Sequence, residues 1–195
     1  MKNIAVISLF ILLNACAIKQ PEIIQKNRPT HWAKIIKADA NLHQVDNLLY
    51  RSEQLIDDDK KTIEQLGIKT IINLRYFDRN DNEQLFKGQS IKLINNPILT
   101  FKAKPSDIAK ALHTIKQEQK HGSVLLHCYH GADRTGIVTA MYRIIYQNWT
   151  IEDARQEMKN GGFGYHSVWK NLDNLLSQDS VNKVKAELEK LEHHQ

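Results

Sequence analysis

Residues 123–149 read SVLLHCYHGADRTGIVTAMYRIIYQNW. The short apolar run at 123–127 predicts a buried strand, and the almost wholly apolar stretch at 135–149 predicts a central buried helix. The loop between them contains Gly131, and Gly136 follows near the start of the helix; glycine permits tight turns and close backbone contacts. A strand that runs through a tight loop into a buried helix is typical of α/β domains. Such sheets bind ligands at the carboxyl ends of their strands, where this loop lies.

Further strands and helices are expected on both sides of this stretch. Short apolar runs bounded by turn residues predict strands, and capped segments with apolar residues at helical spacing predict helices. A chain of 195 residues with 42% hydrophobic content fits one core better than two. We therefore expect a single α/β domain with a central, mostly parallel sheet flanked by helices. The expected strands cover 48–55, 68–75 and 91–98 besides 123–127, and the other expected helices cover 57–67, 104–122, 150–160, 167–177 and 180–192.

The charge of the chain is mildly positive. Its formal net charge is +5 and its sequence pI is about 9.1, but lysines and arginines are interspersed with acidic residues rather than gathered in one block. A weak positive field favours anionic substrates or anionic lipid headgroups. No basic helix or interleaved aromatic platform is apparent, so we do not expect binding to nucleic acid.

The first residues have the pattern of an export signal. Lys2 precedes an apolar run from residue 4 to residue 13, which is too short to span a bilayer as a mature helix. The residues Leu-Asn-Ala-Cys that end at Cys16 resemble a bacterial lipobox, in which the cysteine is acylated and becomes the first mature residue. An ordinary signal peptide with an incidental cysteine is the alternative.

These features predict the organisation of the whole chain. Residues 1–15 are expected to be a lipoprotein signal peptide, residues 16–29 a polar tether, and residues 30–195 the folded domain. The protein would then be a periplasmic lipoprotein, attached to a membrane through Cys16. The sequence does not separate the inner from the outer membrane.

The chain has only two cysteines, Cys16 and Cys128. An exported protein with two cysteines would usually form one disulfide. If lipid modifies Cys16, however, Cys128 is left without a partner in an oxidising compartment. A lone thiol there is a liability unless it has a chemical role.

The loop around Cys128 has the composition of an anion site. Backbone N–H groups at the start of a helix bind phosphate-like anions, and their positive field would keep Cys128 as a nucleophilic thiolate. Arg134 can offer two parallel donors to two phosphate oxygens. The hydroxyl of Thr135 would stabilise the thiolate when it leaves a phosphocysteine, and His127 is expected to anchor the loop rather than act as a base.

Three other interpretations of the loop are open. Cys128 could be an ordinary buried cysteine before a glycine turn. Cys128 could also bind zinc with His127 and His130, although adjacent ligands are poorly placed for a tetrahedral site and no second ligand pair is apparent. A sulfurtransferase of the rhodanese type also carries a loop cysteine, but its usual loop is one residue shorter.

The motif HCYHGADRTG (127–136) resembles the Cys-x5-Arg-[Ser/Thr] phosphate loop of protein tyrosine and dual-specificity phosphatases. The segments RPTHWA, NLLYRSEQL and MYRIIYQNWTIEDARQEMKNGGFG extend the resemblance, to a periplasmic dual-specificity phosphatase of Gram-negative bacteria, over roughly residues 28–172. The resemblance implies a dual-specificity-phosphatase-like fold in which Cys128 is the nucleophile and Arg134 binds phosphate and stabilises the transition state. It also implies that the backbone N–H groups of Tyr129, His130, Gly131, Ala132 and Asp133 bind the phosphate.

The general acid of this family is not evident. These phosphatases protonate the leaving group with an aspartate on an earlier loop, and counting back from Cys128 places Phe101 at that position. Asp107, at an expected helix start, is one candidate, although it equally suits a first-turn partner of the helix dipole. Asp133, inside the loop, is the other candidate.

The resemblance implies a phosphatase that forms a phosphocysteine intermediate and acts on phosphotyrosine, and also on phosphoserine or phosphothreonine, in proteins of the cell envelope. We expect no metal, no organic cofactor and a monomer. Two alternatives are a phosphatase of inositol polyphosphates and a catalytically weak module that binds phosphorylated partners. The sequence does not identify the physiological substrate.

Overall fold

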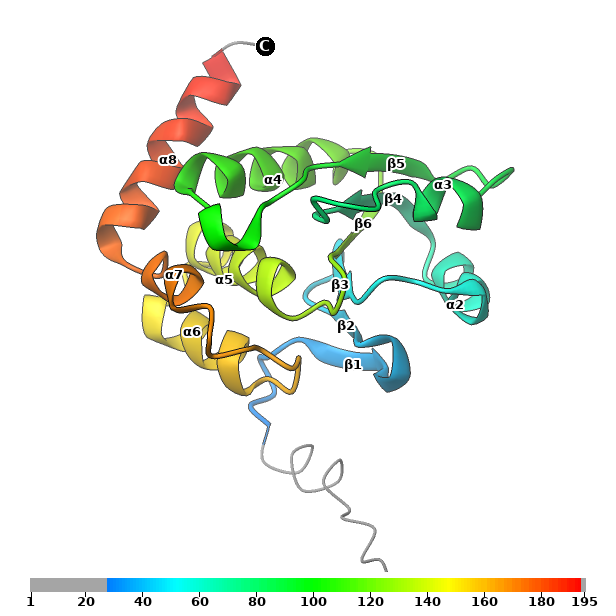
Figure 1. Cartoon of the computed structure of the whole chain (residues 1–195), viewed down its shortest axis with the longest axis horizontal. Helices are drawn as coiled ribbons and strands as arrows, with labels where there is room; N and C mark the ends of the chain where they lie inside the picture. The colour runs from blue at the N-terminus through cyan, green and yellow to red at the C-terminus, as the bar shows by residue number, and fades with distance from the viewer. Residues whose placement is uncertain (1–27, 194–195) are drawn as a thin grey trace, which may run out of the picture.

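The structure is a computed structural model that describes residues 28–193 (Figure 1). The expected signal peptide and the expected lipidation site Cys16 lie outside the described residues. Arg28, at the end of the expected tether, already contacts the domain, because its guanidinium donates to the carbonyl oxygens of Ala33 and Gly161.

A mixed six-stranded sheet forms the centre of the molecule, with strand order β1-β2-β3-β6-β4-β5. The pairs β3–β6, β6–β4 and β4–β5 are parallel, whereas β1–β2 and β2–β3 are antiparallel. β6 therefore lies between two parallel neighbours, and its carboxyl end opens at the same edge as theirs. The strands are β1 (Lys34–Lys37), β2 (Leu42–Gln44), β3 (Leu49–Ser52), β4 (Ile68–Asn73), β5 (Lys92–Asn95) and β6 (Ser123–His127).

Helices cover both faces of the sheet (Figure 1). The helices α4, α5 and α8 pack on one face, with α6 and α7 beside α5, and the short α2 and α3 lie on the other side. The helices are α2 (Lys60–Gln65), α3 (Asp81–Leu85), α4 (Pro105–Glu118), α5 (Asp133–Gln147), α6 (Ile151–Asn160), α7 (Lys170–Asn174) and α8 (Gln178–His193), and the 3-10 turns are η1 (Ala38–Ala40), η2 (Asp57–Asp59) and η3 (Thr100–Lys102).

The alternation of side chains along β6 explains why its three central residues, 124–126, are all apolar. Val124 and Leu126 point into the larger core under α4 and α5, whereas Leu125 points into the smaller core with Ile63 of α2. All of these side chains are fully buried. A central strand covered on both faces needs apolar residues at every position, so the local pattern is a continuous run rather than an alternation.

The expected fold class is confirmed, and most expected elements are present. The strands 48–55, 68–75, 91–98 and 123–127 contain β3, β4, β5 and β6, and each expected helix is found with slightly different ends. The antiparallel hairpin of β1 and β2 and the short α3 were not expected. β1 reads KIIK and is only partly buried, so it lacks an alternating or continuous apolar pattern, and its pairing with β2 defines it as a strand.

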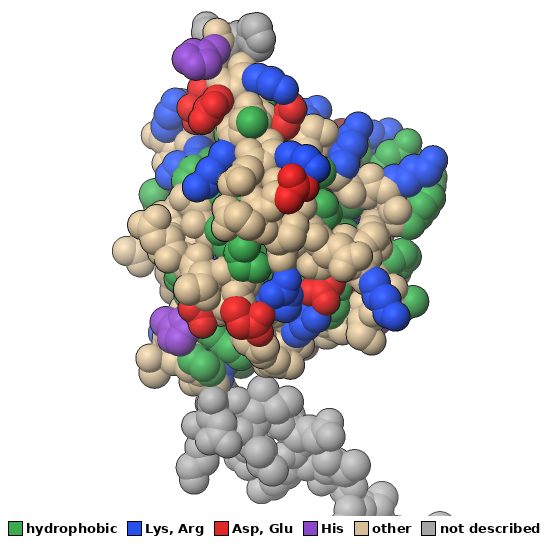
Figure 2. Space-filling view, turned by 90° about the vertical axis from the view of Figure 1, so that its left-hand side faces the viewer, with side chains coloured by type: hydrophobic (Ala, Val, Ile, Leu, Met, Phe, Trp, Pro, Cys, Tyr) green, Lys and Arg blue, Asp and Glu red, His purple; other side chains and the backbone are tan. Residues whose placement is uncertain are grey.

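The surface agrees with the mixed charge pattern of the sequence. Figure 2 looks onto the side of the molecule where α8 lies, and lysine and arginine side chains there are interspersed with aspartate and glutamate. Within residues 28–193 no helix combines the length and the apolar character that crossing a membrane requires.

Candidate active site

The loop that follows β6, residues 128–132, is here called the Cys128 loop. It connects the carboxyl end of β6 to the first turn of α5. Both neighbouring strand ends hold it through the backbone: Gln54 N donates to Tyr129 O at 2.9 Å, and Leu74 N donates to His127 O at 2.8 Å. The loop is therefore positioned by continuation of the parallel sheet rather than by its own side chains.

Gly131 allows the loop to lie against the end of β3. Its φ is +67°, and a Cβ atom there would stand 2.5 Å from Ser52 O and 2.6 Å from Glu53 N. Both the left-handed conformation and the absence of a side chain are thus required at this position. The sequence signal for this glycine was correct, although the neighbour that excludes a side chain is known only from the fold.

A buried arginine that the sequence analysis missed lies behind the loop. Arg51 of β3 is 1% exposed, and its Nη2 donates to Gly131 O at 2.6 Å. Its guanidinium also stacks on Phe163, 3.6 Å from the ring centroid. Burial lowers the pKa of Arg51 to about 10, and the charges of Glu157 and Cys128 act in the opposite direction. A charged residue inside the apolar run LLYRS was the signal that could have identified it.

His127 anchors the loop, as expected. Its Nδ1 bonds Cys128 O at 3.0 Å, and its Nε2 bonds Asn82 Nδ2 at 2.8 Å. Burial lowers the pKa of His127 to about 4, so the ring is neutral near pH 7, with Nδ1 donating and Nε2 accepting. Because both nitrogens are engaged within the protein, His127 is not free to be a zinc ligand with Cys128 and His130.

The three residues expected to perform the chemistry lie at the junction of the loop and α5. Cys128 is 2% exposed, and Arg134 is half-buried with one long hydrogen bond, from Nη1 to Leu74 O at 3.5 Å. The Thr135 hydroxyl is fully buried and has no hydrogen-bond partner among the described residues. The donors of Arg134 and the hydroxyl of Thr135 are thus largely uncommitted beside the predicted nucleophile.

A hollow of about 430 Å³ opens over this junction. Four of the expected phosphate-binding residues line the hollow: Tyr129, His130, Asp133 and Arg134. The other two, Gly131 and Ala132, are buried. The remaining lining comes from η3 and from the segment before α7. The lining residues are Thr100, Tyr129, His130, Asp133, Arg134, His166, Val168 and Trp169.

The two aspartates considered as general acids have well-defined partners. The Asp107 carboxylate accepts from Lys104 N at 3.1 Å, caps the start of α4, and is absent from the lining of the hollow. Asp133 lies in the lining, but both of its oxygens accept hydrogen bonds from His166, one from the backbone N and one from Nδ1, each at 2.9 Å.

The strand, loop and helix follow one another in the expected order, and comparison with known proteins assigns the family. A sequence model described as the tyrosine phosphatase family matches residues 38–175, which contain the whole site. This chain belongs to the tyrosine phosphatase family.

A curated phosphatase of similar sequence is the dual specificity protein phosphatase TpbA of Pseudomonas aeruginosa. It is 30% identical over 138 residues, which are 70% of this chain and 62% of TpbA. This chain therefore matches a little under two thirds of the length of its curated relative. The expected resemblance to dual-specificity phosphatases is confirmed by this sequence similarity.

Solved phosphatase structures share the fold. The crystal structure of P. aeruginosa TpbA has a TM-score of 0.76 at 25% identity and covers 83% of this chain and 98% of that chain. A cysteine-to-serine variant of TpbA in complex with pTyr gives the same TM-score at 24% identity, with the same coverage of both chains. The core catalytic domain of the PP-IP phosphatase SIW14 from S. cerevisiae, in complex with citrate, has a TM-score of 0.61 at 21% identity. The match covers 75% of this chain and 91% of that chain, and at this identity it indicates a shared fold alone.

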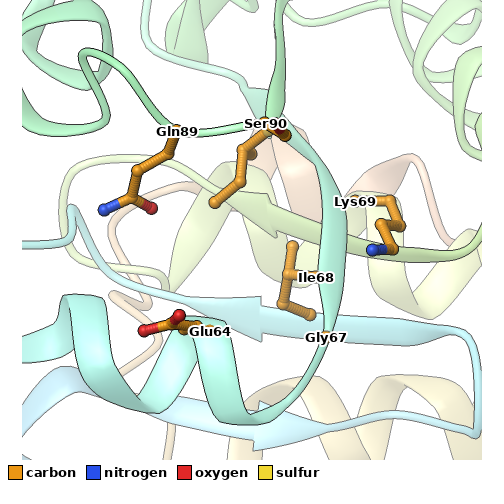
Figure 3. A pocket seen from close by; sticks show the side chains of 7 residues that line it. Glu64, Gly67, Ile68, Lys69, Gln89 and Ser90 are labelled. Atoms are coloured by element: carbon orange, nitrogen blue, oxygen red, sulfur yellow. The ribbon is translucent and has the colours of Figure 1, made fainter.

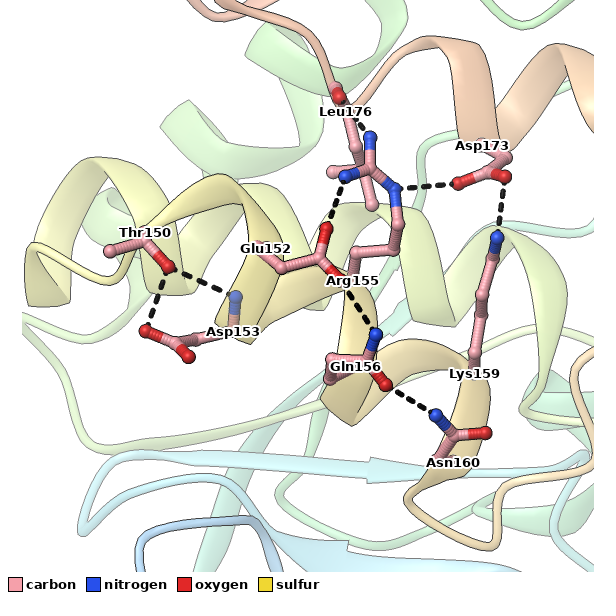
Figure 4. A network of polar contacts seen from close by, with 9 residues as sticks. All are labelled: Thr150, Glu152, Asp153, Arg155, Gln156, Lys159, Asn160, Asp173 and Leu176. Atoms are coloured by element: carbon pink, nitrogen blue, oxygen red, sulfur yellow. Dashed lines mark hydrogen bonds and ion pairs between the residues drawn. The ribbon is translucent and has the colours of Figure 1, made fainter.

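A second loop of the domain, residues 161–169, is here called the His166 loop; the sequence analysis assigned it no role. It connects α6 to α7, and Arg155 of α6 reaches Asp173 of α7 and Leu176 O, while Lys159 pairs with the other oxygen of Asp173 (Figure 4). Asn41 Nδ2 links the two loops, because it donates to His130 O and to Phe163 O, both at 2.9 Å.

Another hollow, of about 370 Å³, lies at the opposite end of the sheet (Figure 3). It is formed by the end of α2 and the segments that begin β4 and β5, with the side chains of Glu64, Lys69 and Gln89 at its edge. α/β sheets bind their ligands at the carboxyl ends of their strands. The hollow over the Cys128 loop, which lies at those ends, is therefore the candidate active site.

Proposed function

We propose that this chain is a cysteine-dependent phosphomonoesterase that works through a phosphocysteine intermediate on Cys128. The observation that carries the proposal is the Cys128 loop itself. It joins a buried cysteine to a hollow that is lined by the next two residues, Tyr129 and His130, and by the half-buried Arg134 in the first turn of α5. Membership of the tyrosine phosphatase family supports the same chemistry.

Each residue has a separate role in this mechanism. The Cys128 thiolate attacks phosphorus, and the backbone N–H groups of the loop with the fork of Arg134 bind the non-bridging oxygens more tightly as charge develops on them. The Thr135 hydroxyl then donates to the sulfur as water displaces it from the phosphocysteine. Arg51, through Gly131 O, keeps the loop in the conformation that this requires.

We propose phosphotyrosine, together with phosphoserine and phosphothreonine, on envelope proteins as the substrate class. The complex of a TpbA variant with pTyr supports an aryl phosphate. Tyr129 and Val168, which line the hollow, are 55% and 75% exposed and provide apolar surface for an aromatic ring. This proposal needs no metal and no organic cofactor, and a monomer is sufficient because one chain supplies the whole hollow.

The proposed chemistry is tested with two substitutions. Cys128→Ser abolishes turnover of p-nitrophenyl phosphate but retains binding of phosphate or vanadate, because the loop N–H groups and Arg134 remain. Arg134→Lys folds but loses several kcal/mol of transition-state stabilisation, because a lysine cannot form the bidentate fork. The exposed His121→Gln serves as a control. Ordinary turnover by Cys128→Ser would overturn the covalent mechanism, and inhibition by EDTA would restore the metal interpretation.

We further propose that the protein is a periplasmic lipoprotein held at a membrane by acylated Cys16. The lipobox-like residues that end at Cys16 and the polar segment that follows support this location. Membrane fractionation of cells that express the full chain or its Cys16→Ala variant tests it. We expect the full chain in the membrane fraction and the variant outside it; a fully soluble periplasmic full chain would contradict the proposal.

A further inference from the structure

Phosphate esters with poor leaving groups need a proton donor, because an alkoxide or phenoxide leaves phosphorus slowly. A positioned acid contributes about 10² to 10⁴-fold to such reactions. The donor must lie in the hollow lined by Arg134 and the residues next to Cys128, within hydrogen-bond reach of the bridging oxygen. The titratable side chains that line this hollow are Tyr129, His130, Asp133, Arg134 and His166.

Asp133 and Arg134 do not suit the role of the acid. Arginine keeps its proton in proteins, and Arg134 is already assigned to the non-bridging oxygens. Both carboxylate oxygens of Asp133 accept hydrogen bonds from His166, and the side chain is only 12% exposed. Because His166 occupies both oxygens, neither is free to donate a proton to a bound ester.

The bonds of Asp133 instead organise His166. One oxygen accepts from the His166 backbone N, which fixes the turn of the His166 loop, and the other accepts from Nδ1 of the ring. Nδ1 therefore carries a proton, and Nε2 is the ring nitrogen that this pair leaves uncommitted. The imidazole is half exposed and lines the hollow with Arg134. Carboxylate-oriented histidines are a common arrangement for proton transfer.

We propose that His166, oriented by Asp133, is the general acid of this phosphatase; this inference rests on the function proposed above. In its protonated form the imidazolium donates from Nε2 to the bridging ester oxygen. As the Cys128 sulfur forms its bond to phosphorus, the P–O bond breaks, its electron pair stays on oxygen, and the proton of Nε2 completes the alcohol or phenol.

The second half of the reaction restores both groups. Neutral His166 Nε2 accepts a proton from a water molecule whose oxygen attacks the phosphocysteine. The P–S bond breaks, the electron pair returns to Cys128 as thiolate, and inorganic phosphate leaves. The same atom thus acts as acid and then as base, and no other proton carrier is needed.

His130 is the competing histidine. Its ring lies 5.6 Å from that of His166 and 4.8 Å from that of Tyr129, measured between centroids. Glu53 is near enough for its charge to interact with His130, but among the described residues no carboxylate forms a hydrogen bond with the His130 ring as Asp133 does with His166. The His166 ring, by contrast, lies in a loop fixed at both ends by the Arg155, Lys159 and Asp173 contacts (Figure 4).

The test measures kcat for a series of aryl phosphates, from p-nitrophenyl phosphate to phenyl phosphate, and for phosphotyrosine across pH. We expect His166→Gln to lose about 10² to 10⁴-fold on phenyl phosphate and phosphotyrosine and much less on p-nitrophenyl phosphate. The alkaline limb of its kcat profile should also disappear. Asp133→Asn should show a smaller loss with the same leaving-group dependence, because it misorients the ring without removing it.

Matched substitutions decide between the candidates. His121→Gln, on the exposed turn after α4, should match the wild type. If the leaving-group dependence steepens in His130→Gln or in Asp107→Asn rather than in His166→Gln, the assignment to His166 is overturned. If His166→Gln keeps wild-type rates on phenyl phosphate, the inference fails while the phosphocysteine mechanism stands. A wild-type chain without turnover of any substrate, or ordinary turnover by Cys128→Ser, would overturn both.

Discussion

The Cys128 loop and the His166 loop line the same hollow but are held in different ways. Backbone bonds from the ends of two parallel strands fix the Cys128 loop, and its residues are contiguous with β6 and α5. Side chains from distant segments fix the His166 loop, including Arg28, Asn41 and Asp133. The residues of the first loop are therefore brought together by the chain itself, although the ends of β3 and β4 hold the loop in place, whereas the second loop reaches the hollow only when the domain has assembled.

The sharpest test of this difference compares two glycines in the left-handed conformation. Gly131 (φ +67°) lies in the Cys128 loop against Ser52 O, and Gly164 (φ +80°) lies in the His166 loop, where a Cβ would meet no atom within 4 Å. We expect Gly164→Ala to cost about 1–2 kcal/mol of unfolding free energy, from backbone conformation alone. Gly131→Ala should cost more and abolish turnover, because the loop must move off β3. Urea denaturation and kcat measure both; equal effects would contradict the comparison.

Two arginines that lie behind the loops give the second test. Arg51 donates to Gly131 O, whereas Arg28 donates to Gly161 O, and both lie against Phe163. Arg51→Met should lower kcat on the order of 10²-fold, because small displacements of catalytic groups cost that much. Its KM should change little.

Arg28→Met is the matched control. It should weaken the His166 loop and spare p-nitrophenyl phosphate turnover, since that substrate needs the general acid least. Arg51→Lys should recover part of the lost rate, because its ammonium can still donate to Gly131 O. An Arg51→Met variant with wild-type kcat would mean that the Cys128 loop keeps its geometry without this bond.

Two buried histidines predict how stability depends on pH. His127 bonds the Cys128 loop, and His43 packs against Phe163 of the His166 loop at 4.8 Å between ring centroids. Burial lowers the pKa of His127 to about 4 and that of His43 to about 3. In the unfolded chain these histidines have ordinary pKa values near 6.5. Between about pH 4 and pH 6.5 the unfolded chain therefore binds more protons than the folded chain.

The contribution of the two histidines to the free energy of unfolding is thus fully present above about pH 6.5. It falls as the pH decreases toward about 4, by about 1.4 kcal/mol per pH unit for each histidine. Urea denaturation between pH 4.5 and 7.5, in steps of about half a unit, measures this slope. His43→Asn, which keeps a donor for Asn41 O, should remove roughly half of it. An unchanged slope would show that His43 does not remain neutral in the folded protein.

The smallest effect is expected from the ion pairs that Asp173 forms with Arg155 and Lys159, drawn in Figure 4. Asp173→Asn should cost about 0.5–1 kcal/mol, the range for a partly exposed pair, and increase amide exchange within the His166 loop. Asp179→Asn, which removes an exposed ion pair to Lys183 on α8, should leave both readouts unchanged. Equal amide exchange in the two variants would show that the Asp173 ion pairs do not order the His166 loop.

Much of the fold was accessible from sequence because its central elements have strong local patterns. The three central residues of the run SVLLH are all apolar, because they face the two hydrophobic cores in alternation. The helix α5 is buried along most of its length. The hairpin of β1 and β2 was missed because its short strands lack such a pattern. Short edge strands are defined by their partners more than by their own residues.

From the sequence, half of the candidate site can be predicted, because its residues are contiguous. Cys128, Gly131, Arg134 and Thr135 lie within eight residues, so one strand, one loop and one helix start suffice to bring them together. The tertiary structure alone decided which distant groups complete it. Arg51 comes from a strand adjacent to β6 in the sheet but 77 positions before Cys128 in the chain, and His166 reaches the hollow because α6 and α7 fold back over α5. Contacts between residues so far apart leave no local periodicity or spacing in the chain, because they depend on how the packed elements are arranged.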